Sequence, residues 1–380
     1  MRLAPCVVSL TLLSFPLLFA QSTVHHVSTS VPIQHPAHEL AAERVSVPHL
    51  ETAVPMAAPA ANQWNLLKVL PGAVIHDIAF PTNTTGYAAA ELGQVWKTTD
   101  GGKTWTEVLD LGFPYYFYGV AALSAKKVIV SGFNDTAQTA GVMRWTNDGG
   151  KTWSGDVIAT PFWQQRVRFV KKLNGVALDL GGDRKGNYAQ YTTNGGANAA
   201  DWNSVVNDPT DGWFGTQFTL LGNLHVYASG INFCKSPNAG AQWSCVRSVD
   251  SVFDGPAFFL NDKRGWVGGG EISPNVEGWV HVTKDGGKTW TGRTLDGPWP
   301  IREVLFLNSK IGWAAGGNLY TGVGGIFFSN DGGLTWNVDV NTGAEMSSCA
   351  ARHVKPNVVV WCAGFDSSFN GVVYQTTVTP

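Results

Sequence analysis

Short apolar segments separated by turns rich in Gly, Asn and Asp make up the chain from Trp64 onward. Val74–Phe80 and Gly86–Ala90 form one pair of such segments, and Glu303–Leu307 with Gly312–Ala315 forms a similar pair late in the chain. Apolar runs of this length, bounded by turn residues, favour strands over helices. The pattern therefore predicts an all-β protein.

A turn of nearly constant sequence follows these pairs of strands, and we call it the repeated turn. Its Asp or Asn side chain can accept hydrogen bonds from downstream backbone N–H groups, and its glycines tolerate positive φ. Its Trp begins the next strand and buries a large ring. The clear copies are Thr98–Trp105, Thr146–Trp153, Thr283–Trp290 and Ser329–Trp336, and the degenerate copies are Thr192–Trp202 and Ser236–Trp243. The structural residues that we predict are Asp100, Trp105, Asp148, Trp153, Asp285, Trp290, Asp331 and Trp336.

The spacing of the tryptophans predicts the number of sheets. Trp64 and the six tryptophans of the repeated turns lie 41 to 49 residues apart, which suits a four-stranded propeller blade with its loops. The last segment, Ser348–Val378, has three strands and no repeated turn, whereas Gln63–Leu70 resembles a strand that follows one. We therefore predict a seven-bladed β-propeller of four-stranded blades, in which the N-terminal strand completes the C-terminal blade and covers its edge.

The repeated turn, with the pattern S/T-x-D-x-G-x-x-W, resembles the Asp-box or BNR repeat of sialidases, sortilin-type receptors, xyloglucan-cleaving hydrolases and photosystem II assembly factors. The resemblance covers residues 62–380. It implies a propeller whose repeated turns lie opposite the ligand face, so that their Asp residues are scaffold. Sialidase chemistry is not supported, because the early strand Val74–Ile78 has no arginine and no arginine triad is evident.

The photosystem II assembly factors are similar in repeat count and in the phrase T-x-D-G-G-K-T-W. This resemblance implies that a basic patch binds a protein partner. The candidate basic residues are Arg166, Arg168, Lys171, Lys172, Arg184 and Lys185, which could equally be solvated side chains on outer strands.

The first 61 residues differ from the rest. Residues 1–20 combine Arg2, the apolar run Val7–Ala20 and a small residue before Gln21, which indicates a cleaved signal peptide. The run is too short for a membrane span and contains Pro16. Residues 21–61 are rich in His, Pro and Ala and predict a disordered leader, while residues 62–380 form the propeller. We expect a secreted, extracellular protein.

Four cysteines remain once Cys6 leaves with the signal peptide. Of the three possible pairings, their spacing favours Cys234 with Cys245 and Cys349 with Cys362. Asn83 and Asn134 each begin an N-glycosylation sequon, which fits a glycoprotein.

The amino-acid composition limits the classes of binding partner that we expect. Charged residues make up 14% of the chain and the formal net charge is -2, so no electrostatic footprint for a nucleic acid is present. The sequence contains no CxxC motif or regularly spaced His cluster, and we predict no metal and no cofactor. We expect a monomer without a membrane span.

The loops between blades are unusually aromatic. Exposed aromatic clusters mark binding sites, and flat rings suit sugar rings, so a glycan or glycoprotein is the predicted partner. The alternative is that these rings pack between adjacent blades. The candidate binding residues are Tyr115, Tyr116, Tyr118, Trp163, Arg166, Trp213, Trp299 and Arg302.

Two carboxylates, Glu91 and Glu271, occupy equivalent positions in blades one and five. Glycoside hydrolysis uses such a pair across a pocket, although a solvated rim also contains carboxylates. The leading hypothesis is a secreted module that binds a glycan or a protein through its aromatic face. One alternative is a glycoside hydrolase or polysaccharide lyase that uses carboxylates on the same face. Another is a partner-binding protein like the photosystem II assembly factors.

Overall fold

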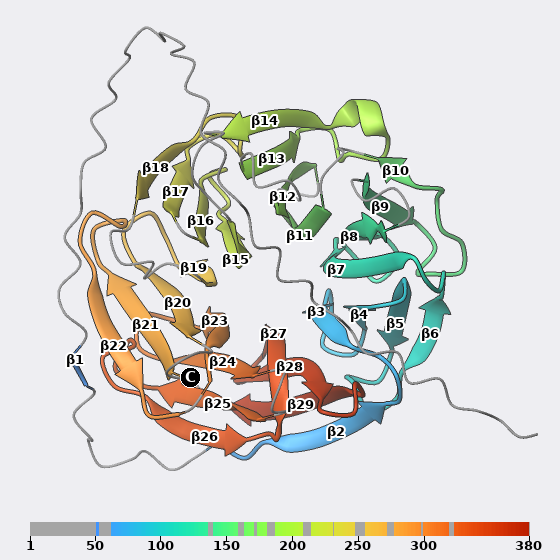
Figure 1. Ribbon diagram of the computed structural model, residues 1–380. Helices are drawn as coiled ribbons and strands as arrows, with labels where there is room; N and C mark the ends of the chain where they lie inside the picture. Colours follow the sequence, from blue (N-terminus) through green and yellow to red (C-terminus); the bar gives the residue numbers. More distant parts are fainter. Residues whose placement is uncertain are drawn as a thin grey trace, which may run out of the picture. The chain divides into compact units, whose positions relative to one another are not determined.

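Seven antiparallel sheets follow one another along the chain and form a ring, a seven-bladed β-propeller (Figure 1). The computed structural model describes residues 51–52, 62–135, 140–158, 163–170, 173–180, 187–207, 214–230, 232–247, 255–271, 277–297, 299–318 and 323–379. Each blade has four strands, numbered outward from the axis of the ring, as the sequence predicts.

The first four blades follow the order of the sequence. Their strands are β3 (Ile75–Ala79), β4 (Gly86–Ala90), β5 (Gln94–Thr98) and β6 (Thr106–Leu109); β7 (Tyr115–Ala122), β8 (Val128–Asn134), β9 (Ala140–Thr146) and β10 (Val157–Ile158); β11 (Trp163–Val170), β12 (Asn174–Leu180), β13 (Asn187–Thr192) and β14 (Asn203–Asn207); and β15 (Phe214–Leu220), β16 (Val226–Gly230), β17 (Asn232–Ser236) and β18 (Ser244–Arg247). A 3₁₀ turn, η2 (Ala199–Asp201), precedes β14.

The last three blades complete the ring. Their strands are β19 (Ala257–Phe259), β20 (Gly265–Glu271), β21 (Glu277–Thr283) and β22 (Thr291–Leu295); β23 (Ile301–Phe306), β24 (Gly312–Asn318), β25 (Val323–Ser329) and β26 (Asn337–Asn341); and β27 (Ala344–Val354), β28 (Asn357–Asp366), β29 (Gly371–Val378) and β2 (Asn65–Leu70). A short strand, β1 (Glu51–Thr52), pairs in parallel with β22 and lies within the segment that we expected to be disordered.

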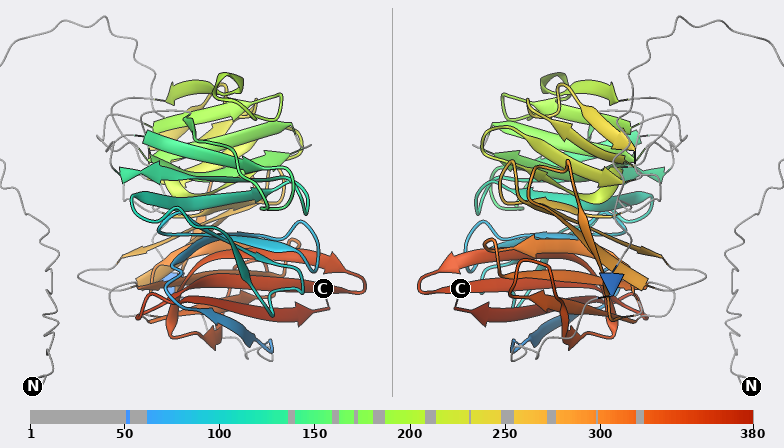
Figure 2. Two further views of the ribbon diagram at one scale, coloured as in Figure 1. Left: turned by 90° about the vertical axis from the view of Figure 1, so that its right-hand side faces the viewer. Right: turned by 90° about the vertical axis from the view of Figure 1, so that its left-hand side faces the viewer.

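The N-terminal strand closes the ring. β2 pairs antiparallel with β29, with Leu70 opposite Gly371. Figures 1 and 2 show the blue β2 beside the red strands of blade seven in every view. Trp64 Nε1 donates a hydrogen bond to Asp339 Oδ2 at 2.6 Å, and Asn62 N donates one to Asp339 Oδ1 at 2.7 Å. The predicted closure is confirmed.

The hydrophobic core is divided among the seven interfaces between blades. Each of the seven clusters of buried residues combines side chains from two adjacent blades. Phe80 stacks on Trp361 at 4.0 Å between blades one and seven, and Phe306 stacks on Trp266 at 3.6 Å between blades six and five. Stability therefore comes from pairs of neighbouring blades and not from any one sheet.

The repeated turns join the third and fourth strands of blades one to six. In the first copy, Gly102 N donates to Thr98 Oγ1 at 2.9 Å, and Thr104 N and Oγ1 donate to the Asp100 carboxylate at 2.9 and 2.6 Å. Trp105 Nε1 donates to the Gly102 carbonyl at 3.0 Å. The hydrogen bonds from Thr104 lower the pKa of Asp100 to about 2. The Asp side chain is occupied by its own turn.

Tryptophans on the second strands fasten neighbouring blades together. Trp361 Nε1 donates to the carbonyl of Gly101 at 2.8 Å, and Trp266 Nε1 donates to the carbonyl of Gly332 at 2.9 Å. Both acceptors lie in the repeated turn of the next blade. The sequence pattern does not reveal this role, because donor and acceptor are far apart along the chain.

Both disulfides join residues directly opposite each other on adjacent strands. Cys234 and Cys245 connect β17 to β18, and Cys349 and Cys362 connect β27 to β28. These are the pairs that the spacing favours. Within the described residues, no helix has the length and apolar character needed to cross a membrane.

Replacing Asp339 with Ala should destabilise the closed ring. Asp339 accepts hydrogen bonds from Asn62, Trp64 and Trp313, and the Trp313 ring is buried. Losing this acceptor should lower the free energy of unfolding by about 2–4 kcal/mol. Urea denaturation measures the change, and Asp296→Ala, at an exposed carboxylate, is the control. Equal midpoints for the two variants would contradict the assigned role of Asp339.

Candidate functional site

Five of the innermost strands carry a one-residue β-bulge, and the pairing of β15 in blade four is also irregular. The pairing register shifts between Ile75 and Asp77, between Phe117 and Gly119, between Gln164 and Arg166, between Ile301 and Glu303, and between Met346 and Ser348. The inserted residues are His76, Tyr118, Gln165, Arg302 and Ser347. Bulges re-aim side chains, and four of these residues line one cavity.

Glycines on the second strands make room for the bulges. A Cβ atom at Gly132 or Gly364 would collide with a backbone carbonyl oxygen of the neighbouring innermost strand, and one at Gly316 would collide with that of Pro300, just before β23. Because only glycine lacks that atom, these positions permit the close approach of the two strands. The glycine-rich second strands of the sequence therefore have a direct structural role.

The cavity, which we call the mouth pocket, encloses about 320 Å³ on the face opposite the repeated turns. Besides the bulged residues His76, Tyr118, Arg302 and Ser347, it is lined by Val74, Glu91, Arg166, Glu345, Phe365 and Phe369. The loops around it join the second and third strands of a blade or connect one blade to the next. Six of these ten side chains are charged or polar. The other four, with Tyr118 among them, are apolar or aromatic.

Charged and aromatic groups lie side by side in the mouth pocket. His76 Nε2 lies 3.3 Å from Glu91 Oε1, and the His76 ring stacks on Tyr118 at 4.1 Å. Arg302 Nε lies 3.7 Å from Glu345 Oε1. Burial and the nearby charge of Glu91 raise the pKa of Tyr118, so its phenol stays protonated. The pocket can thus offer both hydrogen-bond donors and acceptors.

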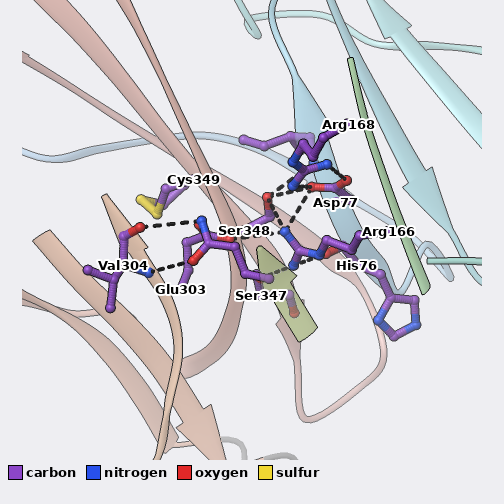
Figure 3. Close-up of polar contacts among 12 residues, drawn as sticks. His76, Asp77, Arg166, Arg168, Glu303, Val304, Ser347, Ser348 and Cys349 are labelled. Carbon is purple, nitrogen blue, oxygen red and sulfur yellow. Dashed lines mark hydrogen bonds and ion pairs between the residues drawn. A yellow bond between two sulfur atoms is a disulfide. The ribbon is translucent and has the colours of Figure 1, made fainter. Parts of the chain in front are cut away.

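A buried ion network closes the inner end of the mouth pocket (Figure 3). The Arg166 side chain donates to Asp77 Oδ1 and Glu303 Oε2, both at 3.1 Å. It also donates to the carbonyls of Ser347 at 2.7 Å and His76 at 3.2 Å. These residues come from blades one, three, six and seven, so the network spans the axis of the ring.

Further groups complete the network. Arg168 donates to Asp77 Oδ2 at 2.9 Å, and Ser348 Oγ donates to Asp77 Oδ1 at 2.8 Å. Gln217 donates to Glu303 and accepts from Val304 N. Figure 3 shows Arg166 and Arg168 both directed at Asp77, with the His76 ring pointing away from it.

The two buried carboxylates have opposite pKa shifts. Burial would raise the pKa of Asp77, but the charges of Arg166 and Arg168 outweigh it and hold that pKa below its ordinary value. Burial raises the pKa of Glu303 to about 7, against the opposing pull of the same arginines. Glu303 therefore exchanges its proton near neutral pH while Asp77 stays ionised.

The structure does not place the two proposed catalytic carboxylates in one described cavity. Glu91 lines the mouth pocket, whereas Glu271 is exposed at the end of β20, opposite Glu277. The second carboxylate of the mouth pocket is Glu345, which the sequence did not single out. Among the described residues, no group of His, Cys, Asp and Glu is arranged to hold a metal ion.

The predicted binding residues are distributed differently. Tyr118, Arg166 and Arg302 line the mouth pocket. Tyr115 donates to Asp156 at 2.9 Å, and Tyr116 stacks on Phe133 at 5.0 Å. The role of all of these residues as ligand contacts stays a prediction.

Other predicted residues lie in the core or outside the described part of the chain. Trp299 is 4% exposed and packs against Phe327 inside blade six, so the ring lies away from solvent. Trp213, and the side chain of Trp163, lie outside the described residues. Arg166 and Arg168 belong to the ion network and not to a surface basic patch, and the other expected members of that patch, Lys171, Lys172, Arg184 and Lys185, lie outside the described residues.

Comparison with known proteins identifies the fold. No protein-family model matches the chain, and no curated protein matches it. Similar solved structures include YCF48 bound to D1 peptide (16% identity, TM-score 0.59, covering 86% of this chain and 99% of that one) and YCF48 from Cyanidioschyzon merolae (21% identity, TM-score 0.59, covering 83% and 99%). The WD40 β-propeller domain of Doa1 is also similar (11% identity, TM-score 0.54, covering 82% and 97%). At these identities the likeness supports the propeller fold alone.

The stability of the protein should depend on the titration of Glu303. The native state raises the pKa of this group from 4.5 to about 7, so its stabilising contribution is complete below about pH 4.5 and is lost as the pH rises through 7. The loss should be about 3 kcal/mol once the pH is above 7. Urea unfolding of the wild type between mildly acid and mildly alkaline pH should show this decline.

Glu303→Gln should remove the decline, because a neutral amide replaces the titrating group. The control is Glu271→Gln at an exposed position, which should follow the wild type. An unchanged pH dependence in Glu303→Gln would show that the buried carboxyl does not titrate in this range.

Proposed function

We propose that this chain is a protein-binding propeller that holds an extended peptide segment of its partner across the mouth pocket. The peptide lies on the face formed by the loops of blades six, seven, one and two. It places an apolar side chain against Phe365 and Phe369 and its main chain beside the charged groups of the pocket.

The observation that carries this proposal is a pair of exposed hydrophobic residues in a strained backbone conformation. Phe369 has φ of 59° and is 57% exposed, and Leu92 has φ of 56° and is 39% exposed. They occupy the equivalent hairpins of the adjacent blades seven and one. Bulky residues rarely adopt positive φ, and such strain clusters at functional sites. Displaying these side chains to solvent costs stability, which binding a partner would explain.

The hairpin that presents Phe369 is held rigidly. The Asp366 carboxylate accepts hydrogen bonds from the backbone N–H groups of Ser368 at 2.8 Å and Asn370 at 2.9 Å. Phe369 N donates to the carbonyl of Asp366 at 2.9 Å, and Asn370 Oδ1 accepts from Gly72 N at 3.2 Å. A preorganised hydrophobic anchor beside a polar pocket loses little entropy when a partner docks.

The polar groups of the pocket suit a peptide main chain. Glu91 and Glu345 can accept hydrogen bonds from peptide N–H groups, and Arg302 can donate to peptide carbonyls. Arg166, whose guanidinium is already engaged in the ion network, forms a closed floor. A ligand therefore stays at the surface, as an extended segment does.

The aromatic residues favour a peptide over a sugar. His76, Tyr118, Phe133 and Tyr116 form a continuous stacked column, with ring centroids 4.1, 5.7 and 5.0 Å apart in that order. Sugar recognition by aromatic side chains needs an open ring face, and the column covers the faces between its members. The exposed apolar groups include the side chains of the two strained residues, which lie outside this column.

The similar solved structures add support of a general kind. One of them, YCF48, is a propeller bound to D1 peptide, so a fold of this type takes a peptide ligand. A partner-binding role like that of the photosystem II assembly factors fits this proposal more directly than glycan binding does. We also propose that the chain works outside the cytoplasm, because its two disulfides persist in oxidising compartments.

A second candidate function is a carbohydrate-active enzyme. The observation that favours it is the presence of two carboxylates, Glu91 and Glu345, in one pocket with a histidine and a tyrosine. A polysaccharide digestion screen tests it. Product release that Glu91→Gln and Glu345→Gln both abolish would establish the enzyme in place of the binding module.

Replacing Phe369 with Asn should separate stability from binding. Asn tolerates positive φ, so the variant should be at least as stable as the wild type in thermal unfolding. A random peptide library displayed on phage and selected on the wild-type protein supplies the ligand. The affinity of the selected peptide, measured by calorimetry, should fall by about tenfold or more in Phe369→Asn.

Leu334→Asn is the matched control, because Leu334 is also exposed but belongs to a repeated turn on the other face. It should leave the peptide affinity unchanged. A library that yields no peptide, or peptides that bind Phe369→Asn as tightly as the wild type, would refute the peptide site. Binding to a glycan array without binding to peptides would support the glycan hypothesis.

A further inference from the structure

A second and larger cavity lies on the other side of the ion network, on the face of the repeated turns. We call it the turn cavity, and its volume is about 650 Å³. All seven innermost strands contribute to its lining, among them β3 with Ala79, β7 with Ala122 and β27 with Cys349. Volumes of this size are typical of sites for small molecules.

Most of the residues that line the turn cavity are apolar. Phe258, Leu220 and Leu305 are half-buried side chains that line it. Two of its polar side chains are already used within the protein. Thr219 donates to the carbonyl of Ala257 at 3.1 Å and accepts from Phe259 N at 2.9 Å, while the Gln217 amide is bonded to Glu303 and Val304.

Arg168 is the polar group of the turn cavity that keeps donor capacity. Within the described chain, its guanidinium donates twice to Asp77 and once to the carbonyl of Val167. A guanidinium has five N–H groups, so two remain for a ligand. The side chain is 26% exposed and reaches the cavity from β11.

The charge around Arg168 favours an anion. Arg166 and Arg168 are balanced by the ionised Asp77, while Glu303 is neutral below a pKa of about 7. Two cations then face one anion at the base of an apolar cavity. A carboxylate that entered the cavity would balance this charge and could form charge-assisted hydrogen bonds with Arg168.

We propose that the turn cavity binds an amphiphilic carboxylic acid, with its carboxylate on Arg168 and its apolar body in the cavity. The ligand class follows from one cation at the base and hydrophobic walls around it. The ion network separates this site from the mouth pocket, so the inference does not depend on the proposed function.

Decanoate is the probe for this site, and decan-1-ol is the matched neutral ligand. Calorimetry with the full mature chain at about pH 6, where Glu303 is protonated, should show one decanoate bound per chain. Decan-1-ol should bind at least about tenfold more weakly, because it lacks the charge that Arg168 recognises. Decanoate should also raise the thermal unfolding midpoint.

Two variants locate the site. Arg168→Gln should weaken decanoate binding by about tenfold or more and leave decan-1-ol binding unchanged. Because Arg168 also supports Asp77, Ala122→Leu provides an independent test that fills the cavity and leaves the ion network intact. Its fold is checked by circular dichroism and by its unfolding midpoint, and it should weaken both ligands.

Glu91→Gln is the control, since Glu91 lies in the mouth pocket, and decanoate binding should be unchanged. The proposal is overturned by the absence of saturable binding up to about 1 mM decanoate. It is equally overturned by equal affinities for the acid and the alcohol, or by a folded Ala122→Leu variant that binds decanoate like the wild type.

Discussion

The burial of one blade against the next is the constraint on which the structure depends. A four-stranded antiparallel sheet with two apolar faces cannot exist alone in water, and here each face is covered by a neighbouring blade. Every blade face is covered only when the last blade packs against the first. Strand β2 completes blade seven, and Asp339 accepts a hydrogen bond from Trp64 where the ring closes. The ring is thus a consequence of covering every blade face.

Closing the ring brings seven innermost strands together around one axis, and this creates the sites. The backbones of these strands do not fill the space along the axis, and charged side chains occupy part of it. Asp77, Arg166, Arg168 and Glu303 are costly to bury singly but satisfy one another when the strands converge. Because the network lies partway along the axis, it leaves a cavity on each side, and the mouth pocket has more charged side chains in its lining than the turn cavity.

The sequence predicts the parts of the fold that repeat. The hydrogen bonds that close the turn from Thr98 to Trp105 lie within these eight residues, so its role as a turn is visible in the local sequence. The blade count follows from the spacing of such turns, and Trp64 reveals the closing strand. The cysteine pairs are predictable because each joins neighbouring strands of one blade. Local signals of this kind suffice for the architecture.

The candidate sites could not be predicted in the same way, because they depend on contacts across the ring. Arg166 is 137 residues from Glu303 and 181 from Ser347. Equivalent positions in a repeat need not converge either, as Glu91 and Glu271 show, since each blade ends in a loop of its own sequence. The bulge that aims Arg302 into the mouth pocket does have a local signal, which is Gly316 on the adjacent strand, whereas the bulge at His76 lies opposite Ala89 and Ala90 and has no such signal. Predicting a propeller site from sequence therefore requires the pairing register between the first two strands of each blade. One inserted residue decides whether a side chain faces the neighbouring blade or the axis of the ring.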